Sequence, residues 1–433
     1  MKKKISTALL GVLLLVSYAK SQPAWNNIPS APTNGRFDDI SVINDSTAFT
    51  GQDGYIYKTT DKGNTWNLIS TLDSVGGGYI RSIEFVNDTI GFAGMLYSAA
   101  PLLGNTYKTT DGGYTWTLLQ NMQIQSSDGI CGMAHYGNTL IAVGTYSGPS
   151  WLYRTNDFGA SWTKTNLGAF ASGLVDCYMI SNDTILVAGI ADAANNFAAT
   201  ILRSVDGGAQ WTRVYLAPTP QSYCWKIFMR PNGLGLASVQ YGSPIVARTT
   251  DGGATWFNVT VYNSATSDLG GIGLLNDTLG WVFDQYDFGT WQTTDGGLTW
   301  SALPASPVES GDRFEVFDSI TALVTGSSVY KYASGTTGVA GVKPLKNKIH
   351  SLIVSPNPAQ KEISISVNAG QNTFGLLFIT DEKGNVIGET QRQPFVKGES
   401  KINRNVSKLT AGTYVVHWRT NELFLAEKFT VVK

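Results

Sequence analysis

The feature that most constrains the fold is a ten-residue segment that recurs six times. Its copies read YKTTDKGNTW (57–66), YKTTDGGYTW (107–116), YRTNDFGASW (153–162), LRSVDGGAQW (202–211), ARTTDGGATW (247–256) and WQTTDGGLTW (291–300). Successive aspartates are separated by 50, 46, 49, 45 and 44 residues. A period of about 40–50 residues with several short strands per unit is typical of propeller blades. The repeat therefore predicts an all-β ring of similar sheets.

Each repeat unit has the same order of segments. An alternating apolar segment such as IRSIEFVNDT (80–89) comes first, and a small-residue segment such as IGFAGML (90–96) follows after an Asn-Asp turn. The Asp-containing hairpin comes next, and a segment such as TWTLL (115–119) closes the unit. This order predicts four antiparallel strands in each unit.

A seventh unit lacks the hairpin motif and has only three predicted strands, over residues 313–335. The segment AWNNIPS (24–30) near the N-terminus is similar to TWSALPAS (299–306), the last strand of the sixth unit. Pairing of 24–30 with the seventh unit would complete that sheet and remove the free edges of the ring. We therefore expect a seven-bladed β-propeller over residues 22–335.

The residue types of the repeated motif each have a local structural task. Asp-Gly-Gly provides positions that tolerate positive φ in a tight turn, and the carboxylate can accept hydrogen bonds from nearby amides and hydroxyls. The tryptophan can then bury a large ring between sheets. We expect a structural role for Asp61, Asp111, Asp157, Asp206, Asp251 and Asp295, and for Trp66, Trp116, Trp162, Trp211, Trp256 and Trp300.

The motif resembles the Asp-box, or BNR repeat, of sialidases, two-propeller xyloglucanases and sortilin-like receptors. That resemblance implies that the hairpins lie at the periphery of the blades, away from any active centre. The pattern of the whole unit, over residues 24–335, also resembles propellers of the photosystem II assembly-factor type. This second resemblance implies a fold and leaves the activity open.

The N-terminus is typical of a secretory signal peptide. Three lysines precede an apolar run over residues 8–16, and small residues follow near position 21. The alternative is a membrane anchor, but the run is too short to cross about 30 Å of hydrocarbon. Removing residues 1–21 removes four lysines and no acid, which changes the formal charge from −1 to −5. We expect no nucleic-acid partner and no transmembrane segment in the mature chain.

The C-terminal part has a different pattern. Residues 336–349 contain Gly, Thr and Lys without strand alternation and are interpreted as a linker. Alternating strands and short turns over residues 350–433 predict a small antiparallel, immunoglobulin-like β-sandwich. The alternative role for such a sandwich is ordinary ligand binding.

Four segments of this tail carry a third resemblance. SPNPA (355–359), DEKGNVI (381–387), LTAGTYVV (409–416) and KFTVVK (428–433) resemble the type A C-terminal sorting domain of the type IX secretion system. The resemblance implies that the type IX machinery is a partner. It also implies Sec-dependent export to the periplasm and a final location outside the cell or on the outer-membrane surface, with the protein either released or attached.

No cofactor or metal site is indicated by the sequence. Cys131, Cys177 and Cys224 are separated by 46 and 47 residues, so they occupy equivalent strands of successive units rather than a zinc-binding pattern. Buried thiols are expected, with a disulfide between neighbouring inner strands as the alternative. His135 is the only histidine of the predicted propeller and has no carboxylate or cysteine next to it in the sequence, which favours a packed or solvated side chain.

A group of charged residues near the starts of the inner strands is the candidate ligand site. Arg36, Arg81 and Arg313 belong to blades 1, 2 and 7, which become neighbours when the ring closes. The other members of the group are Asp38, Asp39, Glu84, Lys226, Asp312 and Glu315. Two interpretations remain open. One is an anion or sugar site with paired carboxylates, and the other is a set of mutually compensating salt bridges.

Two classes of function follow from these residues. The first is a non-enzymatic, exported propeller that binds a glycan or an extracellular protein. The alternative is an exo-acting, sialidase-like glycoside hydrolase at the mouth of the channel. A Phe-Arg-Ile-Pro arginine motif is missing, no tyrosine–glutamate pair can be assigned, and the sequence has one propeller instead of two. These departures from the sialidase and xyloglucanase patterns favour the binding module. The sequence identifies no catalytic residues.

Overall fold

The structure is a computed structural model that describes residues 24–33, 35–72, 79–96, 106–122, 128–286, 289–333, 351–369, 373–381, 386–419 and 424–433. The signal peptide predicted for residues 1–21 and the linker predicted for residues 336–349 lie outside this part of the chain. The described residues contain no helix long and apolar enough to cross a membrane.

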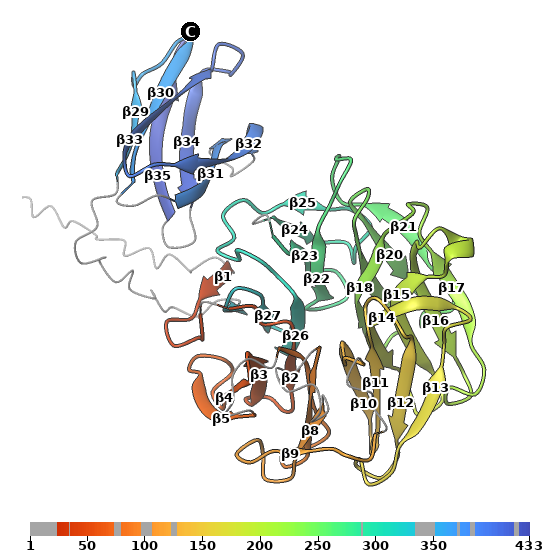
Figure 1. Ribbon diagram of the computed structural model, residues 1–433. Coiled ribbons are helices and arrows are strands. Elements are labelled where there is room, and N and C mark those ends of the chain that lie inside the picture. Colours follow the sequence, from red (N-terminus) through yellow and green to blue (C-terminus); the bar gives the residue numbers. More distant parts are fainter. Residues whose placement is uncertain are drawn as a thin grey trace, which may run out of the picture.

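Residues 24–333 contain seven four-stranded antiparallel sheets, here called blades 1 to 7 (Figure 1). Blade 1 contains β2 (Ile40–Val42), β3 (Ala48–Gln52), β4 (Tyr55–Thr59) and β5 (Asn67–Thr71), and blade 2 contains β6 (Ile80–Phe85), β7 (Gly91–Met95), β8 (Thr106–Thr109) and β9 (Thr117–Leu118). Blade 3 contains β10 (Gly132–Tyr136), β11 (Thr139–Gly144), β12 (Trp151–Thr155) and β13 (Thr163–Asn166), and blade 4 contains β14 (Ala171–Met179), β15 (Ile185–Ala191), β16 (Ala199–Ser204) and β17 (Thr212–Leu216). A 3₁₀ turn, η1 (Ala193–Asn195), joins β15 to β16.

The last three blades complete the ring. Blade 5 contains β18 (Tyr223–Met229), β19 (Gly235–Gln240), β20 (Ile245–Thr249) and β21 (Phe257–Thr260), and blade 6 contains β22 (Leu269–Leu274), β23 (Gly280–Asp284), β24 (Thr290–Thr293) and β25 (Ser301–Ala302). Blade 7 contains β26 (Arg313–Asp318), β27 (Thr321–Thr325), β28 (Val329–Ala333) and β1 (Ala24–Asn27). The all-β propeller expected from the repeat is confirmed.

The N-terminal strand completes blade 7, as the similarity of residues 24–30 to the end of blade 6 predicted. β1 pairs antiparallel with β28, with Trp25 opposite Tyr332. The Trp25 ring is 97% buried and lies edge-on to Trp281 and Phe283 of blade 6, with ring centroids 5.3 Å and 5.2 Å away. The first and last parts of the ring are thus joined by backbone hydrogen bonds and by an aromatic cluster.

The repeated hairpins are closed by their own carboxylates. Asp111 Oδ1 accepts hydrogen bonds from Thr109 Oγ1 at 2.8 Å and from the Thr115 amide at 2.9 Å, and Thr115 Oγ1 donates to Oδ2 at 2.6 Å. Gly112 and Gly113 have φ of +76° and +92°, values that favour glycine at these turn positions. Equivalent bonds to a hydroxyl or amide of the same hairpin are made by Asp61, Asp157, Asp206, Asp251 and Asp295.

The hairpins also connect neighbouring blades. Each of the six hairpin tryptophans packs against a different hydrophobic cluster of the propeller. In three places, a cation on the third strand donates a hydrogen bond to the carbonyl of the glycine that follows the aspartate in the next blade. These pairs are Lys58 with Gly112, Arg154 with Gly207 and Arg248 with Gly296. These three cations therefore link adjacent blades.

The tail forms two packed sheets, shown as a separate group of strands in Figure 1. One contains β29 (Ser351–Ser355), β30 (Glu362–Ala369) and β33 (Gly398–Asn405). The other contains β32 (Val386–Phe395), β31 (Thr373–Asp381), β34 (Gly412–Arg419) and β35 (Phe424–Val431). Alternate residues of β30, including Ile363 and Ile365, are buried in a core shared with Trp418 and Phe429. This period-two pattern is the one expected for sheets that bury one face.

Candidate functional site in the central channel

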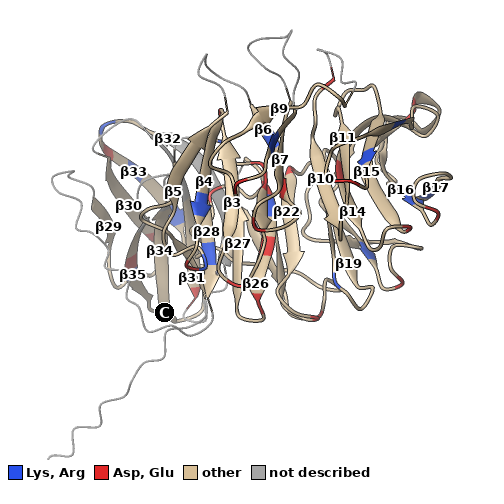
Figure 2. Ribbon diagram, turned by 90° about the horizontal axis from the view of Figure 1, so that it is seen from below, with Lys and Arg blue, Asp and Glu red and all other residues tan. Residues whose placement is uncertain are grey.

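The channel is lined by the first strand of each blade. These inner strands contact one another in a closed circle in the order β2, β6, β10, β14, β18, β22, β26 and back to β2. Each inner strand begins at the same end of the channel, here called the N-terminal mouth, and ends at the C-terminal mouth. Figure 2 shows acidic and basic positions close together on the ribbon around β6, β22 and β26.

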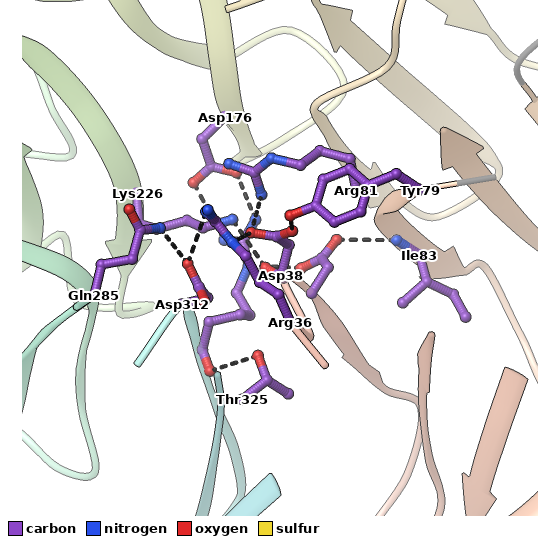
Figure 3. Close-up of polar contacts among 12 residues, drawn as sticks. Arg36, Asp38, Tyr79, Arg81, Ile83, Asp176, Lys226, Gln285, Asp312 and Thr325 are labelled. Atoms are coloured by element: carbon purple, nitrogen blue, oxygen red, sulfur yellow. Dashed lines mark hydrogen bonds and ion pairs between the residues drawn. The ribbon is translucent and has the colours of Figure 1, made fainter. Parts of the chain in front are cut away.

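The charged residues near the N-terminal mouth form an ion-pair network (Figure 3). Arg36 lies 2.8 Å from the Asp38 carboxylate and 3.3 Å from Asp312. Arg81 Nη1 lies 3.1 Å from the same Asp38 oxygen, in an ion pair that lacks hydrogen-bond geometry. Burial acts to raise the pKa of the Asp38 carboxyl, but Arg81 and Arg36 hold that pKa below its usual value. Burial raises the pKa of Asp312, which also accepts a short hydrogen bond from Gln285.

A second layer lies deeper in the channel and joins three blades. Arg313 Nε donates to Asp39 at 2.7 Å, and Arg313 Nη2 donates to Asp176 at 2.5 Å. Both carboxylates also accept a backbone amide bond, Asp39 from Ile83 at 3.0 Å and Asp176 from Ile227 at 2.8 Å. Asp176 was not predicted from the sequence. Its strand, β14, has two register shifts in its pairing with β15, so the residues of β14 that face the channel cannot be counted from simple alternation.

Lys226 reaches the same region from blade 5. Its side chain is 99% buried, and its Nζ donates a hydrogen bond of 3.2 Å to the Asp38 carbonyl oxygen. Burial, together with repulsion from Arg313 and Arg81, lowers the pKa of Lys226 to about 8. The sequence-predicted group of Arg36, Arg81, Arg313, Asp38, Asp312 and Lys226 is therefore brought together, with its cations and carboxylates interleaved.

Glu84 and Glu315, also predicted as site residues, lie nearer the C-terminal mouth. His135 Nδ1 lies 2.6 Å from Glu84 Oε1, across the neighbouring strands β10 and β6. From its neighbours in the sequence, His135 was expected to have no carboxylate partner. The structure corrects this, because adjacent blades place two residues that are 51 positions apart side by side. Burial raises the pKa of Glu315 to about 8, and Glu84 adds to this effect while Arg313 opposes it.

Aromatic side chains surround Arg36 at the N-terminal mouth and were not identified from the sequence. The centre of the Arg36 guanidinium lies 6.0 Å from the Trp225 ring and 5.8 Å from the Tyr286 ring. Tyr223 lies edge-on to both Trp225 and Tyr241, with ring centroids 6.2 Å and 5.8 Å away. Tyr241 and Tyr286 are each 46% exposed. One signal was present, since Tyr223 and Trp225 lie at the start of an inner strand. Tyr241 and Tyr286 instead follow the second strands of their blades, and rings in different blades cannot be assigned to one surface by spacing alone.

The described residues form neither a metal site nor a disulfide between the three cysteines. No group of three or more His, Cys, Asp or Glu side chains among them is arranged to hold a metal ion. The three cysteines are buried and free, which agrees with the buried thiols expected from their spacing and not with the alternative disulfide.

Comparison with known proteins identifies the tail. Residues 354–432 match the family model of the secretion system C-terminal sorting domain. This domain is a sorting signal of the type IX secretion system, which the secretion machinery recognises. It implies export to the cell surface or the extracellular space, as the resemblance of the tail predicted.

The propeller has more distant similarities. A xyloglucanase from a Paenibacillus species is 26% identical over 216 residues, which are 47% of this chain and 18% of the xyloglucanase. Thus the chain spans less than a fifth of that relative. The structure of YCF48 bound to D1 peptide superposes with a TM-score of 0.54 at 17% identity, covering 72% of this chain and 100% of that one.

A GH74 xyloglucanase from Xanthomonas campestris superposes with a TM-score of 0.53 at 15% identity, covering 80% of this chain and 59% of the enzyme. At these identities the structural similarities show the fold alone. The chain is therefore a β-propeller protein that carries a type IX secretion C-terminal sorting domain.

Proposed function

We propose that the protein is an exported, non-enzymatic propeller that binds a glycan or an extracellular protein at the N-terminal mouth of its channel. In this proposal residues 1–21 are the signal peptide, 22–335 the propeller, 336–349 the linker and 350–433 the sorting domain. The site consists of Arg36 and the surrounding rings, supported by Arg81, Asp38, Asp312, Lys226 and Arg313.

The observation that carries the proposal is that the partly exposed Arg36 guanidinium lies within about 6 Å of two aromatic rings, those of Trp225 and Tyr286. The side chain of Arg36 is 33% exposed, whereas that of Arg81 is 3% exposed and that of Arg313 is 10% exposed. Arg36 is therefore the arginine of this group that a ligand can reach from solvent. Aromatic faces pack against sugar rings and apolar side chains. The Arg36 guanidinium already donates one hydrogen bond each to Asp38, Tyr286 and Asp312, and two of its five N–H donors remain for a hydroxyl or carboxylate of a ligand. The fixed pairing with Asp38 and Asp312 holds the guanidinium in place.

The pairing of the arginines also argues against sialidase-type chemistry. That chemistry needs three arginines that converge on a substrate carboxylate, as the family resemblance implies. Here the carboxylates of Asp38, Asp39, Asp176 and Asp312 occupy the arginines. Tyr79 donates a short hydrogen bond to Asp38, which resembles a tyrosine–acid pair. However, burial and the Asp38 charge raise the pKa of Tyr79, and a nucleophile needs the opposite shift.

Two neighbouring carboxyls would serve the second candidate, glycoside hydrolysis. The pKa of Asp38 is lowered and the pKa of the neighbouring Asp312 is raised, a separation that suits a carboxylate and a general acid. In the alternative, Asp312 would protonate the leaving oxygen and Asp38 would stabilise positive charge on the sugar. The sequence similarity of part of the chain to a xyloglucanase is consistent with this alternative.

One experiment separates the two candidates. The purified propeller is screened for binding to a glycan array and to envelope proteins, and the same preparation is assayed for release of sugars from xyloglucan and fluorogenic sialosides. Binding without turnover supports the proposal. Turnover that is abolished by Asp312→Asn, in a variant with unchanged thermal unfolding, would establish the hydrolase instead.

A further inference from the structure

A cavity of about 550 Å³ lies at the other end of the channel from Arg36. Its lining comes from the later part of the inner strands, including Glu84, His135 and Glu315, and from Arg230 just after β18. Arg313 and Asp39 also line it, so the second charged layer separates it from the N-terminal mouth. A volume of several hundred Å³ is typical of a site for a small molecule or a few residues of a peptide.

The cavity has more carboxylates than cations to neutralise them. The Arg313 guanidinium is already paired with Asp39 and with Asp176 behind it. Arg230 is directed to Asp277, whose side chain is 62% exposed, so its charge is neutralised at the surface. Two carboxylates of the lining are therefore paired with neither of these arginines.

These two carboxylates are Glu84 and Glu315. Glu84 has His135 as its partner. Within the described part of the chain, the Glu315 carboxylate makes no hydrogen bond or ion pair, although Arg313 is close enough to affect its pKa. Arg313 and Glu315 are two residues apart on β26 and therefore share the face that lines the channel. Glu315 is half-buried and lines the cavity, so a ligand cation there would supply the partner that its carboxylate lacks.

The walls of the cavity suit an aliphatic stem. Met133, Met179 and Met229 lie on three different inner strands and are each 4–5% exposed, and they line the cavity together with the half-buried Tyr178 and Ile180. Methionine side chains are flexible and polarizable, so they adapt to unbranched chains of different lengths. An apolar wall with acidic groups at its end matches a long side chain that carries a charged head.

We propose that this cavity binds the side chain of a lysine or arginine from a peptide partner, with the cationic head between Glu315 and Glu84 and the methylene stem against the methionines. This site is separate from the N-terminal mouth and does not depend on the function proposed there. An amino sugar would offer the same charge but no extended apolar stem, so the methionine walls favour the peptide side chain.

Binding at this site is coupled to a proton. With its pKa raised to about 8, Glu315 is mostly protonated at neutral pH. The groups that set this state are Arg313 on the same strand, which favours the ionised form, and Glu84, Asp39 and Asp176 on the facing strands, which disfavour it. Tyr178 and His135 complete the surroundings. A bound cation stabilises the ionised form of Glu315, so the proton leaves to the buffer as the ligand binds.

The test is calorimetric titration of the full secreted chain at pH 7 with the peptide acetyl-Gly-Lys-Gly-amide, its arginine counterpart and its norleucine counterpart. We expect the lysine and arginine peptides to bind at least about tenfold more tightly than the norleucine peptide. Titrations in buffers of different ionisation enthalpy should show release of about one proton per peptide. Glu315→Gln should abolish this release and weaken binding about tenfold, whereas Glu399→Gln, on an exposed strand of the tail, should change neither.

Several results would overturn the proposal. It is wrong if the norleucine peptide binds as tightly as the lysine peptide, if neither cationic peptide binds at millimolar concentration, or if Glu315→Gln binds normally. Glucosamine is titrated in parallel, and saturable binding of glucosamine without binding of the peptides would assign the cavity to an amino sugar instead. Because Glu315→Gln keeps the shape of the side chain, its thermal unfolding should match that of the wild type, which separates loss of binding from loss of fold.

Discussion

Arg313 and Asp176 are 137 residues apart in the chain, yet the Arg313 guanidinium donates a hydrogen bond of 2.5 Å to the Asp176 carboxylate in the middle of the channel. Asp39 accepts a second bond from the same guanidinium, so one arginine joins blades 7, 4 and 1. All three side chains are at least 90% buried. This network crosses the channel and links the first and last blades of the ring to the fourth blade.

Removing the arginine from this network should destabilise the propeller strongly. Arg313→Met leaves the Asp39 and Asp176 charges buried without their counter-charge, and breaking a buried pair in this way costs about 3–5 kcal/mol. The measurement is the free energy of unfolding in urea, followed by tryptophan fluorescence. Lys62→Met, which removes an ion pair with Asp318 at the surface, is the matched control and should unfold like the wild type. Equal stability of the two variants would show that the buried network contributes little.

The closing strand gives a second prediction about stability. Trp25 is nearly fully buried against Trp281, Phe283 and Phe314, so Trp25→Ala should lower the free energy of unfolding by about 3–5 kcal/mol. Asn26→Ala, at the next and exposed position of β1, should have little effect. Amide hydrogen exchange should show the loss of protection first in β1 and β28. Unchanged protection in β28 would contradict the role of β1 in closing the ring.

The hairpin carboxylates predict a loss of stability in acid. Hydrogen bonds from Thr115 and Ser161 lower the pKa values of Asp111 and Asp157 to about 2. These folded-state values lie below the ordinary value of 3.8, so the contribution is complete above about pH 4 and is lost as the pH falls towards 2. The free energy of unfolding is measured across this range. The double variant Asp111→Asn, Asp157→Asn should show a shallower fall than Asp45→Asn, which removes an exposed acid outside the hairpins.

The sorting domain leads to a prediction about the cellular compartment in which a truncated chain accumulates. A chain that ends at residue 333 lacks residues 354–432, which match the sorting-domain model. It should fail to cross the outer membrane and accumulate in the periplasm, whereas the full chain reaches the cell surface or the medium. Immunodetection in cell fractions measures this. Truncated protein in the medium at the level of the full chain would show that the tail is not needed for export.

The fold could be predicted because its main determinants are local. Each hairpin places its aspartate, glycines and tryptophan within ten residues, so one copy shows the turn and six copies show the ring. The pairing of β1 with β28 is long-range, but the similarity of residues 24–30 to the last strand of a blade was enough to predict it. In the tail, the sequence patterns around 355–359 and 409–416 are enough to indicate the domain class.

The candidate site was predicted only in part, because its contacts join different blades. Arg36, Arg81 and Arg313 could be placed near one another from their positions at inner-strand starts, but the partner of each depends on which residues face the channel. Register shifts in β14 and β18 change which residues face the channel, so Asp176 could not be predicted from simple alternation. The cavity beside Glu315 could not be predicted, since it depends on the shapes of six different inner strands.

The most direct test of the central claim is calorimetric titration of the ligand found in the binding screen into the wild-type chain and into Arg36→Gln and Tyr241→Ala. Both variants change partly exposed side chains at the N-terminal mouth, and Tyr114→Ala, an exposed tyrosine on an outer hairpin, is the control. We predict that the first two variants bind at least about tenfold more weakly, that the control binds normally, and that the ligand is recovered unchanged. Full affinity in both mouth variants, or recovery of a cleaved ligand, would contradict the account.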